Sequence, residues 1–221
     1  MSFFNDLNQD RPNEHLPKPR VFGVGGSPRK YGNSDVLLRQ ILNTAKENKI
    51  SVDKNQLRDY QFQPCIGCER CRKDKICTGL NDGMSILYPT ILDSQGLVLV
   101  SPTHNYNVTA LVKAFIDRLY CFYNFNDKRP RGWTSRLADQ ERKAVIAAVC
   151  EQETKKDMGF TLEAMRRPLE ALGYEIIGEL AVFGVFDRGR VKEKKEALGK
   201  ASELGADLAN ALLLNSKINK P

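Results

Sequence analysis

Apolar residues along the chain alternate between continuous runs and helically spaced positions. The run GLVLVSPT at 96–103 is typical of a fully buried strand, whereas Leu37, Leu38, Ile41 and Leu42 share one face of a helix. The same distinction assigns the rest of the chain. We predict strands at 21–27, 49–57, 96–103, 142–150 and 174–185. We predict helices at 33–48, 84–94, 109–125, 158–173 and 191–214.

Strands that alternate with helices indicate a parallel sheet covered on both faces. Five strands and five helices fit a flavodoxin-like three-layer α/β sandwich, with strand order 2-1-3-4-5 and a cysteine-rich loop at 58–83 after the second strand. Ligands of such sheets bind at the carboxyl ends of the strands. We therefore expect the functional residues to gather in the loops at 25–34, 58–83, 101–109 and 150–158.

The length of 221 residues predicts one domain over 20–221, preceded by a polar arm over 1–19 that contains three prolines. No apolar run approaches the roughly 20 residues of a membrane span, and the N-terminus lacks the apolar segment of a signal peptide. We therefore expect a cytoplasmic protein without a membrane partner, whose thiols stay reduced.

The net charge of +7 is spread along the chain, with denser basic patches at 70–75 and 188–195. No sequence signature of a DNA- or RNA-binding module accompanies it, so we expect no nucleic-acid partner. Anionic small ligands or acidic protein partners fit the charge equally well.

The loop GGSPRKYGNS, between the first strand and its helix, has the composition of a phosphate cradle. Free backbone N–H groups and the helix dipole attract an anion there, and Ser27, Arg29, Asn33 and Ser34 add donors. The dinucleotide motif that starts at Gly23 fails at Pro28, and no Walker A loop is present. The alternative is an ordinary turn in which Asn33 or Ser34 is the N-cap.

The loop SPTHNYN places polar and aromatic groups after the third strand. Backbone amides and asparagine side chains can bind the edge of a flat heteroaromatic ring while Tyr106 or His104 lies against it. The alternative is a polar loop that caps the helix near Thr109. We identify no catalytic acid or base, apart from His104 as a candidate proton relay. Asp117 and Arg118 are expected to be an ordinary pair on a helix face.

Cys65, Cys68, Cys71 and Cys77 form the pattern C-x2-C-x2-C-x5-C. Consecutive x2 spacings resemble the compact run that wraps a [4Fe–4S] cluster in bacterial ferredoxins, with Cys77 as the nearby fourth ligand. Structural zinc uses four thiolates as well, but its two cysteine pairs are usually separated by a dozen or more residues. Zinc and a loop without metal remain alternatives.

The remaining residues near this run have simpler expected roles. The cations between the ligands can stabilise an anionic cluster or dock an acidic donor protein. These cations are Arg70, Arg72, Lys73 and Lys75. Cys121 and Cys150 lie in apolar stretches and are expected in the core.

Three segments together resemble the NADPH-dependent FMN reductase superfamily, and more narrowly its iron–sulfur flavoproteins. They are GSPRKYGNS, the cysteine segment ending in NDGM, and SPTHNYNVTALVKAFIDR, and they span roughly residues 20–120. The resemblance implies a flavodoxin-like fold with the FMN phosphate in the first loop and the isoalloxazine ring at the second. The cofactor-binding residues it implies are Ser27, Arg29, Gly32, Asn33, Ser34, Pro102, Thr103, His104, Asn105, Tyr106 and Asn107.

The resemblance implies an oxidoreductase that carries electrons through FMN and a [4Fe–4S] cluster, held near each other, in a homodimer or homotetramer. The donor is ferredoxin or NAD(P)H and the acceptor a small molecule. The segment 123–143 is longer than the family core needs, so we expect a lid or a subunit contact. The alternatives are an NAD(P)H-dependent FMN or quinone reductase without a cluster, and a zinc-binding flavodoxin-like interaction module.

Overall fold

The computed structural model describes residues 19–218, so residues 1–18 of the predicted arm lie outside the described residues. Five parallel strands form the central sheet in the order β2-β1-β3-β6-β7. The strands are β1 Arg20–Gly25, β2 Ser51–Gln56, β3 Gly96–Pro102, β6 Lys143–Val149 and β7 Glu175–Val182. The predicted order 2-1-3-4-5 is confirmed, because β4 and β5 form a separate hairpin.

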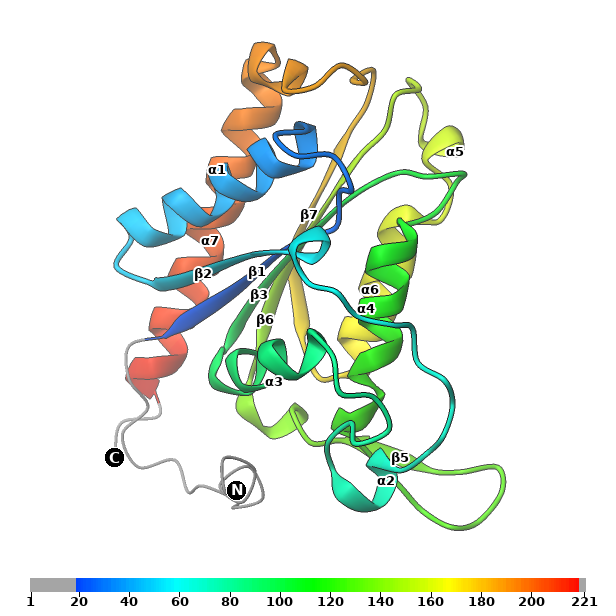
Figure 1. Cartoon of the computed structure of the whole chain (residues 1–221). Helices are drawn as coiled ribbons and strands as arrows, with labels where there is room; N and C mark the ends of the chain where they lie inside the picture. The colour runs from blue at the N-terminus through cyan, green and yellow to red at the C-terminus, as the bar shows by residue number, and fades with distance from the viewer. Residues whose placement is uncertain (1–18, 219–221) are drawn as a thin grey trace.

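Helices cover both faces of the sheet (Figure 1). Helices α1 (Asn33–Glu47) and α7 (Lys195–Ile218) pack on one face. The other face carries α3 (Met84–Asp93), α4 (Ala110–Arg118) and α6 (Thr161–Ala171). Side chains that alternate along a strand point to opposite faces, so Val21 and Phe22 belong to different core clusters. The predicted three-layer sandwich is therefore the observed fold.

The predicted helix at 109–125 is wrong in its second half. Helix α4 ends at Arg118, and the chain continues as the 3₁₀ turn η3 (Leu119–Phe122). The antiparallel pair β4 (Tyr123–Phe125) and β5 (Trp133–Ser135) follows. Shorter elements complete the chain. They are η2 Leu57–Asp59, α2 Cys71–Asp74, η4 Ala138–Gln140, α5 Lys155–Met158 and η5 Arg190–Glu193.

A buried arginine closes the carboxyl end of α3. Arg142 is 0% exposed and donates hydrogen bonds to the carbonyl oxygens of Ile91 (2.6 Å), Leu92 (2.7 Å) and Ser94 (2.6 Å). These are carbonyls that a helix end leaves without partners.

Among residues 19–218, no helix is long and apolar enough to cross a membrane.

Candidate functional site

The segment predicted to bind phosphate, called the phosphate loop below, lies between the end of β1 and the start of α1. Gly32 is the N-cap of α1 and no side chain caps the helix, so the prediction of Asn33 or Ser34 as N-cap is wrong. An α-helix leaves its first N–H groups without helical acceptors, and they carry its positive dipole end, although Asp35 N here donates to Gly32 O (3.1 Å). Ser27 and Ser34 are buried beside them, and this arrangement suits an anion.

The side chain of Asn33 is already occupied. Its Nδ2 donates to the carbonyl oxygens of Phe186 (3.4 Å) and Asp187 (3.0 Å), and its Oδ1 accepts from the N–H of Val191 (3.1 Å). The amide therefore ties the loop after β7 to the start of α1. In this arrangement Asn33 offers an anion its backbone N–H, and its side chain positions the loop.

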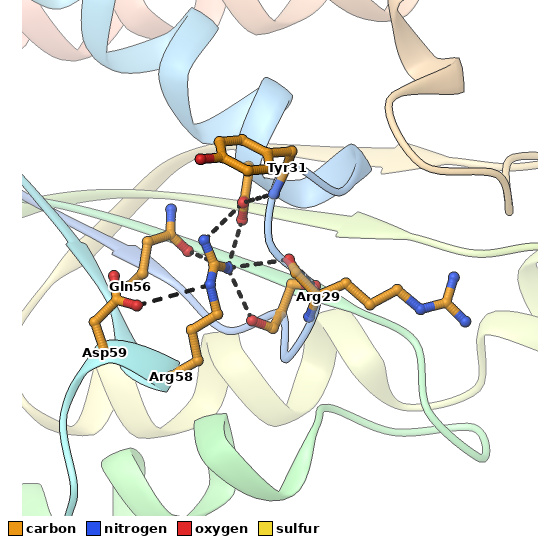
Figure 2. A network of polar contacts seen from close by, with 7 residues as sticks. Arg29, Tyr31, Gln56, Arg58 and Asp59 are labelled. Atoms are coloured by element: carbon orange, nitrogen blue, oxygen red, sulfur yellow. Dashed lines mark hydrogen bonds and ion pairs between the residues drawn. The ribbon is translucent and has the colours of Figure 1, made fainter.

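Arg58, which no sequence pattern indicated, holds the phosphate loop in place through its guanidinium (Figure 2). It forms a two-pronged ion pair with Asp35 of α1, at 2.9 and 2.8 Å. Its Nη1 also donates to the carbonyl oxygens of Ser27 (3.0 Å) and Arg29 (3.1 Å), and to Gln56 Oε1 (3.0 Å). Its position directly after β2, at the carboxyl edge of the sheet, was the available signal.

The loop after β3 forms a tight turn at the same edge. His104 N donates to Asn107 O (2.8 Å) and Asn107 N donates to His104 O (3.1 Å). Asn105 and Tyr106, at the tip, have φ angles of 48° and 64°, a left-handed conformation that is uncommon for such residues. All four side chains of the turn are exposed. The turn thus presents its polar edge and Tyr106 to a ligand.

Two threonines fix this loop to its neighbours. Thr109 caps α4 and its hydroxyl donates to the carbonyl oxygen of Gly26 (2.7 Å), so the two predicted flavin loops are joined directly. The hydroxyls of Thr161 and Thr103 are hydrogen-bonded to each other (3.0 Å). Phe160 N donates to Tyr106 O (2.8 Å), which brings the exposed Phe160 ring to this edge. Phe160 was also missed, since an isolated aromatic residue in a loop has no distinctive pattern.

All four predicted cysteine ligands line one cavity of about 240 Å³. Cys65 and Cys68 are exposed, whereas Cys71 and Cys77 are half-buried. Burial raises the pKa of the Cys71 thiol to about 11, and the charges of Cys77, Cys65 and Cys68 add to the shift. Gly79 lies against Cys68 Sγ, where any side chain would collide with the sulfur. The segment therefore folds around its thiols.

Four cysteine thiols that line one cavity are a donor set for a four-iron cluster and for structural zinc alike. Among residues 19–218, no three His, Cys, Asp or Glu side chains are already arranged to hold one metal ion. A zinc site needs its sulfurs at about 2.3 Å from a common centre. A four-iron cube instead takes one thiolate at each corner, so it requires a wider spacing of the sulfurs than zinc does.

The cysteine cavity lies away from the carboxyl edge of the sheet. The loop starts at that edge after β2, but the cavity is lined by Arg118 and Tyr120, at the far end of α4 (Figure 1). The loop after β3, which is predicted to bind the isoalloxazine ring and is called the ring loop, precedes the first residue of α4. This helix has nine residues and is roughly 13 Å long at 1.5 Å per residue. The expectation that the cysteines lie at the carboxyl edge of the sheet, beside the predicted FMN-binding loops, is thus wrong.

Arg118 closes the base of the cysteine loop. It is 2% exposed and forms a two-pronged ion pair with Asp82, at 2.7 and 3.0 Å. The predicted helix-face pair of Asp117 with Arg118 is wrong, since Asp117 pairs with Lys113 (2.5 Å). Burial favours the neutral carboxyl of Asp82, but hydrogen bonds from Arg118, Gln63 and Met84 outweigh it and lower its pKa.

The segment 123–143 packs against the cysteine loop. Lys75 Nζ donates to Asn124 Oδ1 (2.7 Å), and Arg136 Nη1 donates to the carbonyl oxygen of Lys75 (2.5 Å). The Arg72 guanidinium lies over the Phe125 ring, at 5.6 Å from its centroid. Of the predicted basic patch, Arg72 and Lys75 are thus held by this segment. Arg70 and Lys73 are exposed and form no ion pair within residues 19–218.

The chain is similar in sequence to known proteins. The family model of NADPH-dependent FMN reductase matches residues 19–166. An iron-sulfur flavoprotein of Archaeoglobus fulgidus is 30% identical over 87% of this chain and 80% of its own length. One of Methanocaldococcus jannaschii is 35% identical over 45% of this chain and 51% of its own length.

Solved structures show the same fold at low sequence identity. An FMN-dependent NADH-azoreductase from Bacillus anthracis, in complex with FMN, is 16% identical with a TM-score of 0.65, over 87% of this chain and all of that one. An NAD(P)H:quinone oxidoreductase from Methanothermobacter marburgensis is 17% identical with a TM-score of 0.63, with the same coverage. The chain therefore belongs to the NADPH-dependent FMN reductase family and, within it, to the iron–sulfur flavoproteins.

Proposed function

We propose that this FMN-dependent oxidoreductase moves electrons between a one-electron carrier such as ferredoxin and a small acceptor, through FMN and a [4Fe–4S] cluster. The observation that carries the proposal is the convergence of Cys65, Cys68, Cys71 and Cys77 on one cavity. Family membership supports the flavin, and the shared cavity of the four cysteines supports the cluster.

Residues of two loops hold FMN in this proposal. The buried Ser27 and Ser34, with the N–H groups that begin α1, bind the phosphate, and Arg29 adds charge. The turn over Pro102–Asn107 binds the ring edge. When bound, the cluster supplies single electrons and the flavin exchanges one or two, so the pair links one-electron and two-electron chemistry. His104 remains a candidate proton relay, exposed in the turn.

We further propose a cytoplasmic homodimer or homotetramer. Its support is the family resemblance together with the separation of the cysteine cavity and the ring loop by the length of α4. In an assembly, the cavity of one chain can lie beside the flavin of another. The segment 123–143 either covers the cysteine loop as a lid or forms this subunit contact.

The proposal is tested by purifying the chain without oxygen and measuring its visible spectrum with its iron, acid-labile sulfide, zinc and flavin. We expect FMN together with about four iron and four sulfide per chain, and a broad absorbance near 400 nm beyond that of flavin. Stoichiometric zinc without sulfide would contradict the cluster and favour the zinc-binding module. Flavin without metal, with rapid oxidation of NADPH, would favour a reductase without a cluster.

A Ser34→Ala variant is expected to bind FMN about 10- to 100-fold more weakly, because it loses one hydrogen bond to a charged phosphate. The Ser34 hydroxyl has no protein partner within residues 19–218, so the change leaves the fold intact. Fluorescence titration of the apoprotein with FMN measures the effect, with Ser51→Ala, an exposed serine of β2, as control. Unchanged affinity would remove Ser34 from the phosphate site.

Reduction by an acidic carrier protein is expected to slow as salt rises, because Arg70 and Lys73 attract it. A double Arg70→Gln and Lys73→Gln variant should flatten this salt dependence in stopped-flow measurements. The matched control replaces Lys46 and Lys54, exposed on α1 and β2. An equal salt dependence in the two double variants would contradict docking at the cysteine loop.

A further inference from the structure

Arg118, which closes the base of the cysteine loop, also lines its cavity. Arg118 donates to the carbonyl oxygen of Gln63 (2.8 Å), while Gln63 N donates to Asp82 Oδ2 (3.0 Å). Gln63 directly precedes Pro64 and the cysteines, and Asp82 follows the last of them. One guanidinium from α4 therefore holds both ends of the segment that carries all four thiols.

The positive member of the pair is the one that faces the cysteines. Arg118 lines the cavity together with the four thiols, whereas Asp82 is not among the lining residues. Burial by itself lowers the pKa of Arg118. The hydrogen bond to Asp82 opposes burial and the pKa of Arg118 lies above its ordinary value, and a guanidinium in any case stays protonated in proteins.

One donor of this arginine has no partner. Both terminal nitrogens are engaged, but Nε of Arg118 is buried without a hydrogen bond. Arg58, Arg72 and Arg166 share this feature within residues 19–218, and of these four Arg118 is the one at the cysteine cavity. A buried donor without a partner costs free energy unless a ligand supplies the acceptor.

We propose that Arg118 is a positioning residue of the cluster site. It fixes the two ends of the cysteine loop and presents a buried cation and its free Nε–H to the sulfur atoms of the bound cluster. The inference rests on the proposed cluster. Hydrogen bonds and positive charge near the sulfurs stabilise the more negative, reduced state, so Arg118 raises the reduction potential.

The loop-closing role is tested on the apoprotein, without any cluster. Arg70, Arg72, Lys73 and Lys75 are trypsin sites within the loop. We expect Arg118→Gln to speed cleavage there about tenfold over wild type. The control is Arg142→Lys, another buried arginine, which does not line the cavity. Equal cleavage in wild type and Arg118→Gln would overturn the loop-closing role, whether or not the protein binds a cluster.

The electrostatic role is tested by redox titration of the reconstituted protein, monitored by visible absorbance. At the wild-type midpoint potential, Arg118→Gln should raise the ratio of oxidised to reduced cluster about tenfold. This ratio corresponds to a midpoint potential about 59 mV lower for one electron. Asp82→Asn loosens the same pair but keeps the cation, so its ratio should not rise. A ratio within threefold of wild type in Arg118→Gln, or an equal rise in Asp82→Asn, would overturn the role.

If Arg118→Gln does not fold, both measurements are made on Arg118→Lys instead. Lysine keeps a charge beside Asp82 but loses the Nε–H and the fork of donors. We expect faster trypsin cleavage of the loop and a rise of the ratio smaller than tenfold. Wild-type behaviour in both measurements would overturn the proposal. Absence of iron and sulfide from the wild-type protein would instead overturn the proposed function, and the apoprotein cleavage would still decide the loop-closing role.

Discussion

A Cys71→Ala variant is expected to lose almost all of about four iron atoms per chain and to keep its FMN. Cys71 begins α2 and is one of the two half-buried thiols of the cysteine cavity, so the variant lacks one of the four proposed ligands. FMN should stay because the loops proposed to bind it lie at the other end of α4. Iron, sulfide and flavin analysis after anaerobic reconstitution measures both results.

The raised pKa of Cys71 adds a pH dependence to this result. With a pKa of about 11, the thiol is protonated at neutral pH, and binding iron releases its proton. Wild-type apoprotein should therefore take up the cluster more readily as the pH rises.

The matched control for Cys71→Ala is Cys150→Ala, a buried cysteine outside the cavity, which should keep its iron. Full iron content in Cys71→Ala would refute the ligand assignment.

An Arg58→Met variant is expected to lose about 3 kcal/mol of unfolding free energy, because it strands the buried Asp35 without its partner. The side chains of Arg58 and Asp35 are only 13% and 5% exposed. For a chain of this size, such a loss lowers Tm by about 6–12 °C. FMN should also bind at least about tenfold more weakly, since the loop carbonyls of Ser27 and Arg29 lose their donor.

A double-mutant cycle separates the pair from its surroundings. Asp35→Asn combined with Arg58→Met should cost less than the sum of the single changes, because neither charge is then left alone. Arg39→Met, an exposed arginine of α1, is the control and should leave Tm unchanged. A Tm shift below about 2 °C in Arg58→Met, measured by calorimetry, would show that the ion pair does not stabilise the loop.

Elements with a regular local pattern were predictable from the sequence. The runs at 96–103 and 142–150 became β3 and β6, and even Pro89 did not prevent α3. The end of α4 at Arg118 was not predictable, because the aromatic residues that follow suit a helix face and a strand equally well. Tyr120, Tyr123 and Phe125 instead pack on one another around the hairpin.

The site was predictable in its residue types and less so in its partners. The cysteine spacing led to one cavity, and the glycine-rich loop to the start of α1. Arg118 and Asp82 lie 36 residues apart, and a buried ion pair at that separation has no local periodicity. Likewise, Asn33 binds a loop more than 150 residues away, which its place in the motif does not reveal.

Helix α4 is anchored at both ends, so its length sets the distance between the two anchored sites. Thr109 ties its first turn to Gly26, and Arg118 ties its last turn to Asp82. Each added residue rotates the end of an α-helix by about 100° and advances it by about 1.5 Å. A single-residue insertion in α4 would therefore turn the arginine away from its carboxylate while the threonine kept its bond. The spacing between the proposed flavin loop and the cysteine cavity can therefore change only by nearly whole helical turns.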